Sequence, residues 1–262
     1  MTSSVIKRAV PAINRVPEVT LDFWLIKIMA VTMGETAADY LAVNLGLGLT
    51  VTSLIMSGIL IVALVLQFAQ KRYVPWAYWL AVVLISVVGT LVTDNLVDNF
   101  GVRLETTTIV FSAVLALTFV AWYASERTLS IHTIFTTRRE IFYWLAILFT
   151  FSLGTAAGDL VAESFDMGYF TTGLIFGGVI AAITLAWFFL GLNGVLAFWL
   201  AYILTRPFGA SFGDLLSQPV EYGGMGFGTT VTSLTFLGSI VVIVLYMTLR
   251  NMIEEDEQAL LD

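Results

Sequence analysis

The chain has 262 residues, of which 58% are hydrophobic and only 12% are charged, against about 25% charged in a typical soluble domain. The net charge of −7 comes without a basic stripe, which excludes a nucleic-acid-binding surface, and the lack of cysteine excludes a structural disulfide. The composition predicts an integral membrane protein, whose first partner is the lipid bilayer.

The N-terminal residues 1–18 contain Lys7, Arg8 and Arg15 and lack the apolar core and small-residue cleavage site of a secretory signal. We expect them to form a short cytoplasmic arm. The apolar segment that follows also belongs to the repeat described next, so we expect it to be retained.

Four tryptophans, each preceded by another aromatic residue, mark an internal repeat. They stand at positions 24, 79, 144 and 199, which are 55, 65 and 55 residues apart. Ten residues after each tryptophan comes a glycine, and five residues after that an aspartate. These pairs are Gly34 and Asp39, Gly89 and Asp94, Gly154 and Asp159, and Gly209 and Asp214. Similarity at a regular spacing indicates tandem copies of one unit. We expect the glycines to pack between helices and the tryptophans to anchor the cytoplasmic interface.

Each unit reads as two apolar helices joined by a short turn. In chain order, the predicted helices are 20–45, 50–70, 75–98, 106–124, 141–163, 169–190, 195–216 and 228–249. The predicted boundaries are an arm at 1–18, repeats at 19–73, 74–138, 139–193 and 194–250, and an acidic cytoplasmic tail at 251–262. A cytoplasmic loop is predicted at 125–140, after the second helix of the second repeat. The predicted fold class is an all-α polytopic membrane protein with eight transmembrane helices.

The cationic residues predict the orientation, because Lys and Arg are enriched in cytoplasmic loops. One side of the predicted membrane holds Lys7, Arg8, Arg15, Lys71, Arg72, Arg127, Arg138, Arg139 and Arg250, and the other holds Arg103. Both termini are therefore expected in the cytoplasm. Since each unit crosses twice, the four two-helix repeats are expected to be parallel, with pseudo-symmetry about the membrane normal.

The repeated aspartates are the main functional candidates, because an ionisable side chain within a bilayer is costly unless it faces a cavity or a partner. Further acids lie one turn from three of them, and hydroxyl residues begin each return helix. The predicted cation-binding residues are Asp39, Asp94, Asp159, Asp214, Glu35, Asp98, Glu163, Thr52, Thr107, Thr172 and Thr230. Carboxylate and hydroxyl oxygens without nearby Cys or His suit Mg²⁺, Mn²⁺, Ca²⁺, an alkali ion or a proton path.

For a metal ion, the hypothesis takes as ligands Glu35, Asp39, Asp94, Asp159 and Asp214. No cofactor is required, and a bound divalent or alkali cation is the expected ligand. Lys27 and Arg206 lie within the first and seventh predicted helices. They are interpreted either as structural ion pairs or as internal counter-charges that gate the site.

The leading functional hypothesis is a transporter or channel for a small inorganic cation, with a divalent metal favoured over a proton or an alkali ion. The alternative is a non-transporting scaffold or regulator, in which the aspartates cap neighbouring helices and form ion pairs. An enzyme is not expected, because no nucleophile with a neighbouring base is apparent. The sequence does not determine the oligomeric state.

With its Phe-Trp pairs, glycine-aspartate spacing and threonine turns set out fourfold, the chain resembles a family of bacterial inner-membrane proteins. Its members consist of four tandem two-helix repeats of unknown function and are usually labelled uncharacterised membrane-anchored proteins. The resemblance extends from Val16 to Arg250 and is carried by the runs 16–20, 34–39 and 205–214. It implies the repeat architecture and a bacterial inner membrane, and it implies no activity.

Overall fold

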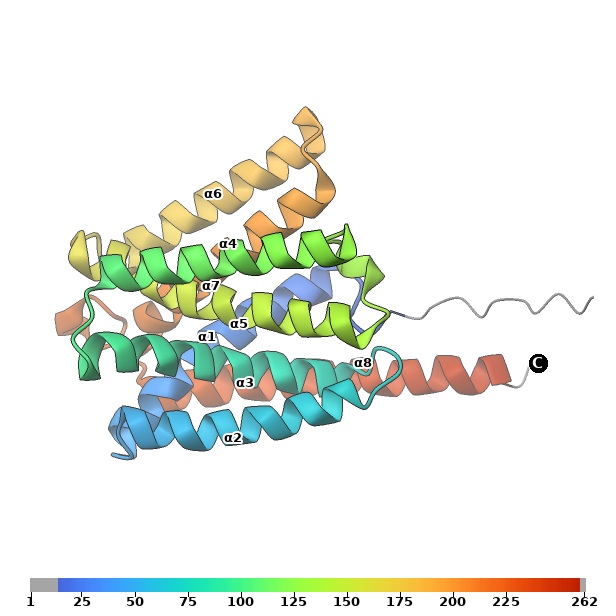
Figure 1. The fold of residues 1–262 in the computed structure, drawn as a ribbon. Helices are drawn as coiled ribbons and strands as arrows, with labels where there is room; N and C mark the ends of the chain where they lie inside the picture. Colours follow the sequence, from blue (N-terminus) through green and yellow to red (C-terminus); the bar gives the residue numbers. More distant parts are fainter. Residues whose placement is uncertain (1–13, 260–262) are drawn as a thin grey trace, which may run out of the picture.

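The computed structural model describes residues 14–259, and within that range it is built from helices without strands (Figure 1). The α-helices are α1 (Leu21–Asp39), α2 (Leu49–Phe68), α3 (Pro75–Asp94), α4 (Leu104–Glu126), α5 (Thr137–Asp159), α6 (Gly168–Leu190), α7 (Gly194–Ser217) and α8 (Thr229–Ala259). The predicted all-α fold is confirmed. Residues 1–13 of the predicted arm and 260–262 of the predicted tail lie outside the described residues.

One connection between helices is shorter than predicted, and one helix is longer. The segment between α4 and α5 covers residues 127–136, and it contains a short 3₁₀ turn, η3 (Ile131–Thr133). Helix α5 begins early because the hydroxyl of Thr136 accepts a hydrogen bond from the backbone N–H of Arg139, which caps the helix. Helix α8 continues to Ala259, so most of the predicted acidic tail is helical.

The odd-numbered helices form an inner ring and the even-numbered helices pack outside it. In the ring α1 contacts α3, α3 contacts α5, α5 contacts α7, and α7 contacts α1 again. Helices α2, α4, α6 and α8 lie on α3, α5, α7 and α1, respectively (Figure 1). About three-fifths of the apolar stretches of α3, α5 and α7 are buried, whereas 17% or less is buried in the outer helices. The outer helices therefore present their apolar side chains outward.

The repeated glycines allow neighbouring inner helices to approach closely. A Cβ added at any of them would lie within 3.0 Å of a side chain on the next inner helix. The facing pairs are Gly34 with Ser86, Gly89 with Phe151, Gly154 with Arg206 and Gly209 with Val31. Each partner stands three residues before the glycine of its own repeat. The same contact therefore recurs at all four junctions and returns from α7 to α1.

The aromatic pairs close one end of the ring. The first aromatic residue of each repeat packs on the tryptophan of the next. The ring centroids are 5.7 Å apart for Phe23 and Trp79, 5.5 Å for Tyr78 and Trp144, 6.2 Å for Tyr143 and Trp199, and 5.8 Å for Phe198 and Trp24. Three of these tryptophans are buried, and Trp24 is partly buried. These tryptophans therefore contribute to packing inside the bundle, on the aromatic residues of the neighbouring repeat.

At the same end, Arg15 ties the start of the chain to the bundle. Its Nη1 donates a 2.8 Å hydrogen bond to Oε2 of Glu140, a fully buried acid at the start of α5. The other oxygen of Glu140 accepts from Nε2 of Gln67 at 3.0 Å. Residues from the predicted arm, α2 and α5 are therefore joined by one buried polar cluster.

Seven of the helices described in residues 14–259 are long and apolar enough to cross a membrane. Helix α1 is not one of them, because its sequence includes Lys27, Glu35 and Asp39. Its position in the inner ring explains this composition, since its charged side chains face other helices. The helix lengths and composition are those of a multi-pass membrane protein.

Candidate cation site

Residues four positions apart on each inner helix form five rows around the centre of the ring. From the aromatic end, the first row is Phe23, Tyr78, Tyr143 and Phe198, and the second is Lys27, Val82, Ile147 and Tyr202. The third is Val31, Ser86, Phe151 and Arg206, the fourth is Glu35, Thr90, Thr155 and Ala210, and the fifth is Asp39, Asp94, Asp159 and Asp214. All of them are buried or partly buried. On each helix, successive residues of this series lie on neighbouring turns, offset by roughly 40° from one row to the next.

A cavity of about 180 Å³ lies at the aspartate row. Its acidic lining consists of Glu35, Asp39, Asp94, Asp98, Asp159, Glu163 and Asp214. Tyr169 and Gln218 add a hydroxyl and an amide to the same wall. The structure therefore brings together every carboxylate that the sequence analysis selected, from all four repeats.

Three of the aspartates lie at the junction of an α-helix with a π-helical turn. These turns are η1 (Tyr40–Asn44), η2 (Asn95–Asn99) and η4 (Leu160–Ser164). Single π turns within helices occur frequently at functional sites. Helix α7 has no such turn and instead runs to Ser217, followed by a 3₁₀ turn, η5 (Val220–Tyr222). The fourth repeat therefore shapes its part of the cavity differently.

The aspartates do not cap the neighbouring helices. The carboxylate of Asp39 accepts a 3.2 Å hydrogen bond from Nε2 of Gln218, and within residues 14–259 no hydrogen bond or salt bridge joins the carboxylates of the other three to a protein group. The asparagine after Asp94 makes the inter-helix contact instead, since Nδ2 of Asn95 donates to Oγ of Ser53 at 2.6 Å. The aspartate oxygens are thus left to the cavity.

The four predicted threonines are not among the cavity-lining residues. The hydroxyls of Thr52 and Thr107 donate to the carbonyls of Gly48 and Arg103 in the first turn of their own helices, at 2.8 and 3.2 Å. Thr172 is buried with no hydrogen-bond partner for its hydroxyl among the described residues, and Thr230 is exposed. The structure therefore does not bring these four hydroxyls to the acidic cavity.

Arg206 belongs to the third row, and its fully buried side chain reaches the fourth row, which lies next to the aspartates. Its Nη2 lies 2.8 Å from Oε2 of Glu35 and 2.7 Å from Oγ1 of Thr155, and it also hydrogen-bonds Oγ1 of Thr90. The guanidinium carbon lies 5.5 Å from the centre of the Phe151 ring. The ion pair of Arg206 therefore reaches across from α7 to α1.

Lys27 lies deeper, between Arg206 and the aromatic row. Its ammonium donates to the carbonyl of Tyr202 at 3.0 Å and to Oγ1 of Thr205, and it lies 3.9 Å from the centre of the Tyr202 ring. No carboxylate among residues 14–259 forms a salt bridge with it. The Lys27 side chain is thus fully buried, and its amino group lies among neutral oxygens and aromatic faces.

Within the described residues, 14–259, no three His, Cys, Asp or Glu side chains converge closely enough to hold a metal ion directly. The five carboxylates of the metal hypothesis line the cavity without forming a compact ligand set. A cation in the cavity would therefore retain bound water between itself and part of the wall.

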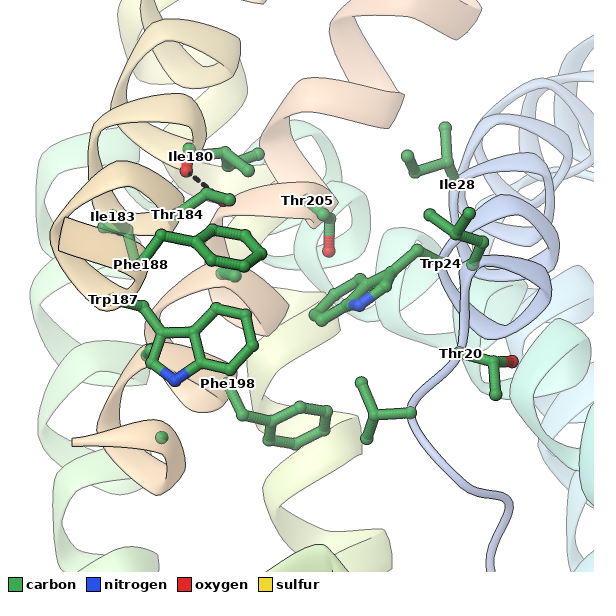
Figure 2. Close-up of a pocket in the computed structure, with 15 residues that line it drawn as sticks. Thr20, Trp24, Ile28, Ile180, Ile183, Thr184, Trp187, Phe188, Phe198 and Thr205 are labelled. Atoms are coloured by element: carbon green, nitrogen blue, oxygen red, sulfur yellow. Dashed lines mark hydrogen bonds between the residues drawn. The ribbon is translucent and has the colours of Figure 1, made fainter. Parts of the chain in front are cut away.

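A second cavity, of about 510 Å³, is apolar and lies between α1, α6 and α7 (Figure 2). Trp24 and Trp187 stand on opposite walls, with Thr205 between them. In the preceding repeat the equivalent tryptophan, Trp122, packs on Trp199 with ring centroids 5.7 Å apart. Trp187 is 47% exposed and makes no such contact with α1. This junction of the outer layer is more open than its counterpart.

Sequence analysis missed Thr90, Thr155 and Tyr169. The two threonines directly follow repeated glycines, at the position that Glu35 occupies in the first repeat. Aligning the repeats at that position would have placed them beside Glu35. Tyr169 begins α6 outside the inner ring, and no repeated feature marks it.

A family model described as Repeat of Unknown Function (DUF347) matches the chain four times, at residues 23–73, 77–128, 142–192 and 197–252. No curated protein and no solved structure matches the chain. The four matches together cover most of the chain, in agreement with the repeated glycines, aspartates and aromatic pairs. The chain therefore belongs to this family of tandem repeats of unknown function.

Proposed function

We propose that the protein is a transporter or channel for a small inorganic cation in a bacterial inner membrane. The observation that carries this proposal is the single cavity lined by seven carboxyl groups, drawn from all four repeats. In a low-dielectric bundle, neighbouring carboxylates repel one another and must be neutralised by cations or protons. Arg206 pairs with Glu35 alone among them, which leaves the remaining acids for a ligand.

The proposed arrangement has eight membrane crossings, both termini in the cytoplasm and the acidic cavity toward the outer side. Arg15, Arg138 and Arg139 lie at the aromatic end, whereas Arg103 directly precedes α4 at the acidic end, and this asymmetry supports the orientation. The glycine contacts that recur at four junctions support parallel repeats about the membrane normal. Helix α1 crosses within the ring, packed against α3, α7 and α8.

The proposed pathway follows the five rows. A cation would enter the acidic cavity and then meet Arg206, Lys27 and the aromatic row in turn. A positive charge on either of these two basic side chains would repel an incoming cation until the side chain moves or exchanges partners. Arg206 and Lys27 are therefore the residues that would gate the pathway. The aromatic row closes the cytoplasmic end.

The size of the cavity favours a hydrated cation. Its volume of about 180 Å³ corresponds to roughly six waters, at about 30 Å³ each in the liquid. Mg²⁺ usually keeps several of its waters and binds proteins through one or two carboxylates. A hydrated divalent cation is therefore the proposed transported ion, with a proton or an alkali ion as the alternative.

Replacement of Asp94 with asparagine is expected to weaken cation binding. At 100 times its dissociation constant, a ligand specific to the folded state adds about 2.7 kcal/mol, or roughly 5 to 10 °C in melting temperature. Purified wild type should show this shift with MgCl₂ or MnCl₂ relative to choline chloride of equal ionic strength. Asp94→Asn should show a smaller shift, because one cavity carboxylate has lost its charge.

Asp166→Asn is the matched control. Asp166 is exposed in the turn before α6 and does not line the cavity, so this variant should keep the wild-type shift. If no cation shifts the melting temperature of the wild type, and Asp94→Asn is simply less stable, the protein is better described as a scaffold. Equal shifts in Asp94→Asn and Asp166→Asn would place the cation elsewhere.

A further inference from the structure

The hydrogen bonds of Arg206 are concentrated on one nitrogen. Nη2 contacts oxygens from three helices, namely Glu35 of α1, Thr90 of α3 and Thr155 of α5. A guanidinium has five N–H donors in a fixed planar fork, and Nη2 carries two of them. Three oxygens therefore surround an atom that can donate two hydrogen bonds.

The rest of the guanidinium has no polar partner. Nε and Nη1 are buried and make no hydrogen bond with any described residue, although Arg206 has no exposed surface. A site formed to bind a guanidinium would distribute its acceptors along the fork, as bidentate carboxylate pairs do. Oxygens gathered around one point are instead the arrangement that a spherical cation requires.

The three oxygens also occupy equivalent places in the repeats. Glu35, Thr90 and Thr155 each directly follow the repeated glycine of an inner helix, and Ala210 holds this position in the fourth repeat. They form the row next to the aspartates, one helical turn deeper in the ring. The oxygen shell is therefore a feature of the ring, into which α7 inserts the Arg206 side chain.

The path of the Arg206 stem depends on the neighbouring helix. A Cβ at Gly154 would clash with Cβ and Cγ of Arg206, so this glycine leaves room for the stem to run along α5. The Phe151 ring lies beside the guanidinium and offers no hydrogen bond to its free N–H groups. The surroundings thus hold the stem in place and bring Nη2 to the oxygens.

We propose that Glu35, Thr90 and Thr155 form an inner site for a monovalent alkali cation, and that Nη2 of Arg206 occupies this site as a tethered cation. One carboxylate and two hydroxyls supply a single negative charge and neutral oxygens, which match one positive charge. The role of this site in transport rests on the proposed function, because a passing ion would take the place of Nη2. Cation binding at the site does not depend on transport.

The test removes the tethered cation. Arg206→Ala should acquire a response to NaCl or KCl that the wild type lacks, measured against choline chloride at equal concentration. A near-saturating alkali ion should raise the melting temperature of the variant by roughly 5 to 10 °C. The response should disappear in Arg206→Ala/Glu35→Gln, because the site has lost its carboxylate.

A second double variant separates the inner site from the acidic cavity. Arg206→Ala/Asp94→Asn should retain the alkali response, because Asp94 belongs to the row above. If Arg206→Ala responds no more than the wild type, or if its response persists without Glu35, the inner site is disproved while the proposed function stands. An alkali response that depends on Glu35 in a protein without cation flux would disprove transport and leave the inner site.

If Arg206→Ala does not fold in any of these salts, Arg206→Lys and Arg206→Met provide the test. The lysine ammonium is a point charge with three donors, which suits three oxygens around one position. Arg206→Lys should therefore melt well above Arg206→Met, which has an apolar side chain of similar length. Equal melting temperatures for these two variants would overturn the proposal.

Discussion

Gly89→Ala is expected to destabilise the protein by about 3 kcal/mol, at the upper end of the usual range for overpacking. The added Cβ would lie 2.7 Å from Cβ of Phe151 and 3.3 Å from backbone atoms of Phe151 and Ser152. Backbone atoms cannot rotate away, so α3 and α5 would have to separate. Thermal unfolding of the purified protein in detergent, followed by circular dichroism, measures the loss.

Gly58→Ala provides the matched control. Gly58 lies within α2, and a Cβ added there would meet no atom within 4 Å. Because alanine favours a helix over glycine by about 1 kcal/mol, this variant should be as stable as the wild type or slightly more stable. Equal losses at positions 58 and 89 would show that the inner helices do not approach through the repeated glycine.

Glu35→Gln is expected to cost about 3 to 5 kcal/mol, the range for breaking a buried ion pair by neutralising one partner. The substitution leaves the guanidinium of Arg206 fully buried with no carboxylate in contact. Chemical unfolding in mild detergent should show the loss as a lower midpoint. The exposed pair of Arg103 and Glu105 serves as control, and Glu105→Gln should change stability by no more than about 0.5 kcal/mol.

The double variant Glu35→Gln/Arg206→Met tests the reason for this loss. Removal of the buried cation together with its partner should recover most of the stability, because no uncompensated charge remains. If the double variant is less stable than Glu35→Gln, the destabilisation arises from lost packing around Arg206 and not from its charge.

Much of the fold follows from the sequence because the repeat is strict. Apolar spans separated by glycine-containing turns predict the eight helices. Glycine five residues before aspartate sets each acid at the same level on an inner helix, so the convergence of Asp39, Asp94, Asp159 and Asp214 on one cavity follows from the spacing. The tandem-repeat family indicated by the same features is confirmed by the family comparison.

Other features depend on contacts between helices, which periodicity does not encode. The π turns after three of the aspartates do not alter the spacing of the apolar residues, so the sequence pattern does not predict them. The hydroxyls of Thr52 and Thr107 were expected at the site because they begin the return helices. Instead they donate to the carbonyls of Gly48 and Arg103, which also accept the backbone N–H groups of the same two threonines. Arg206 and Glu35 are 171 residues apart and are brought together only when the ring closes between α7 and α1.

The most direct test of the central claim is cation uptake into proteoliposomes loaded with a Mg²⁺- and Mn²⁺-sensitive dye. We predict uptake by wild type and Asp166→Asn above that of protein-free liposomes. A folded variant in which Asp39, Asp94, Asp159 and Asp214 are all replaced with asparagine should lose at least nine-tenths of that uptake, since roughly 1.4 kcal/mol in cation affinity is a tenfold change. Unchanged uptake in the fourfold variant, or wild-type protein that moves neither divalent cations, alkali ions nor protons, would contradict the account.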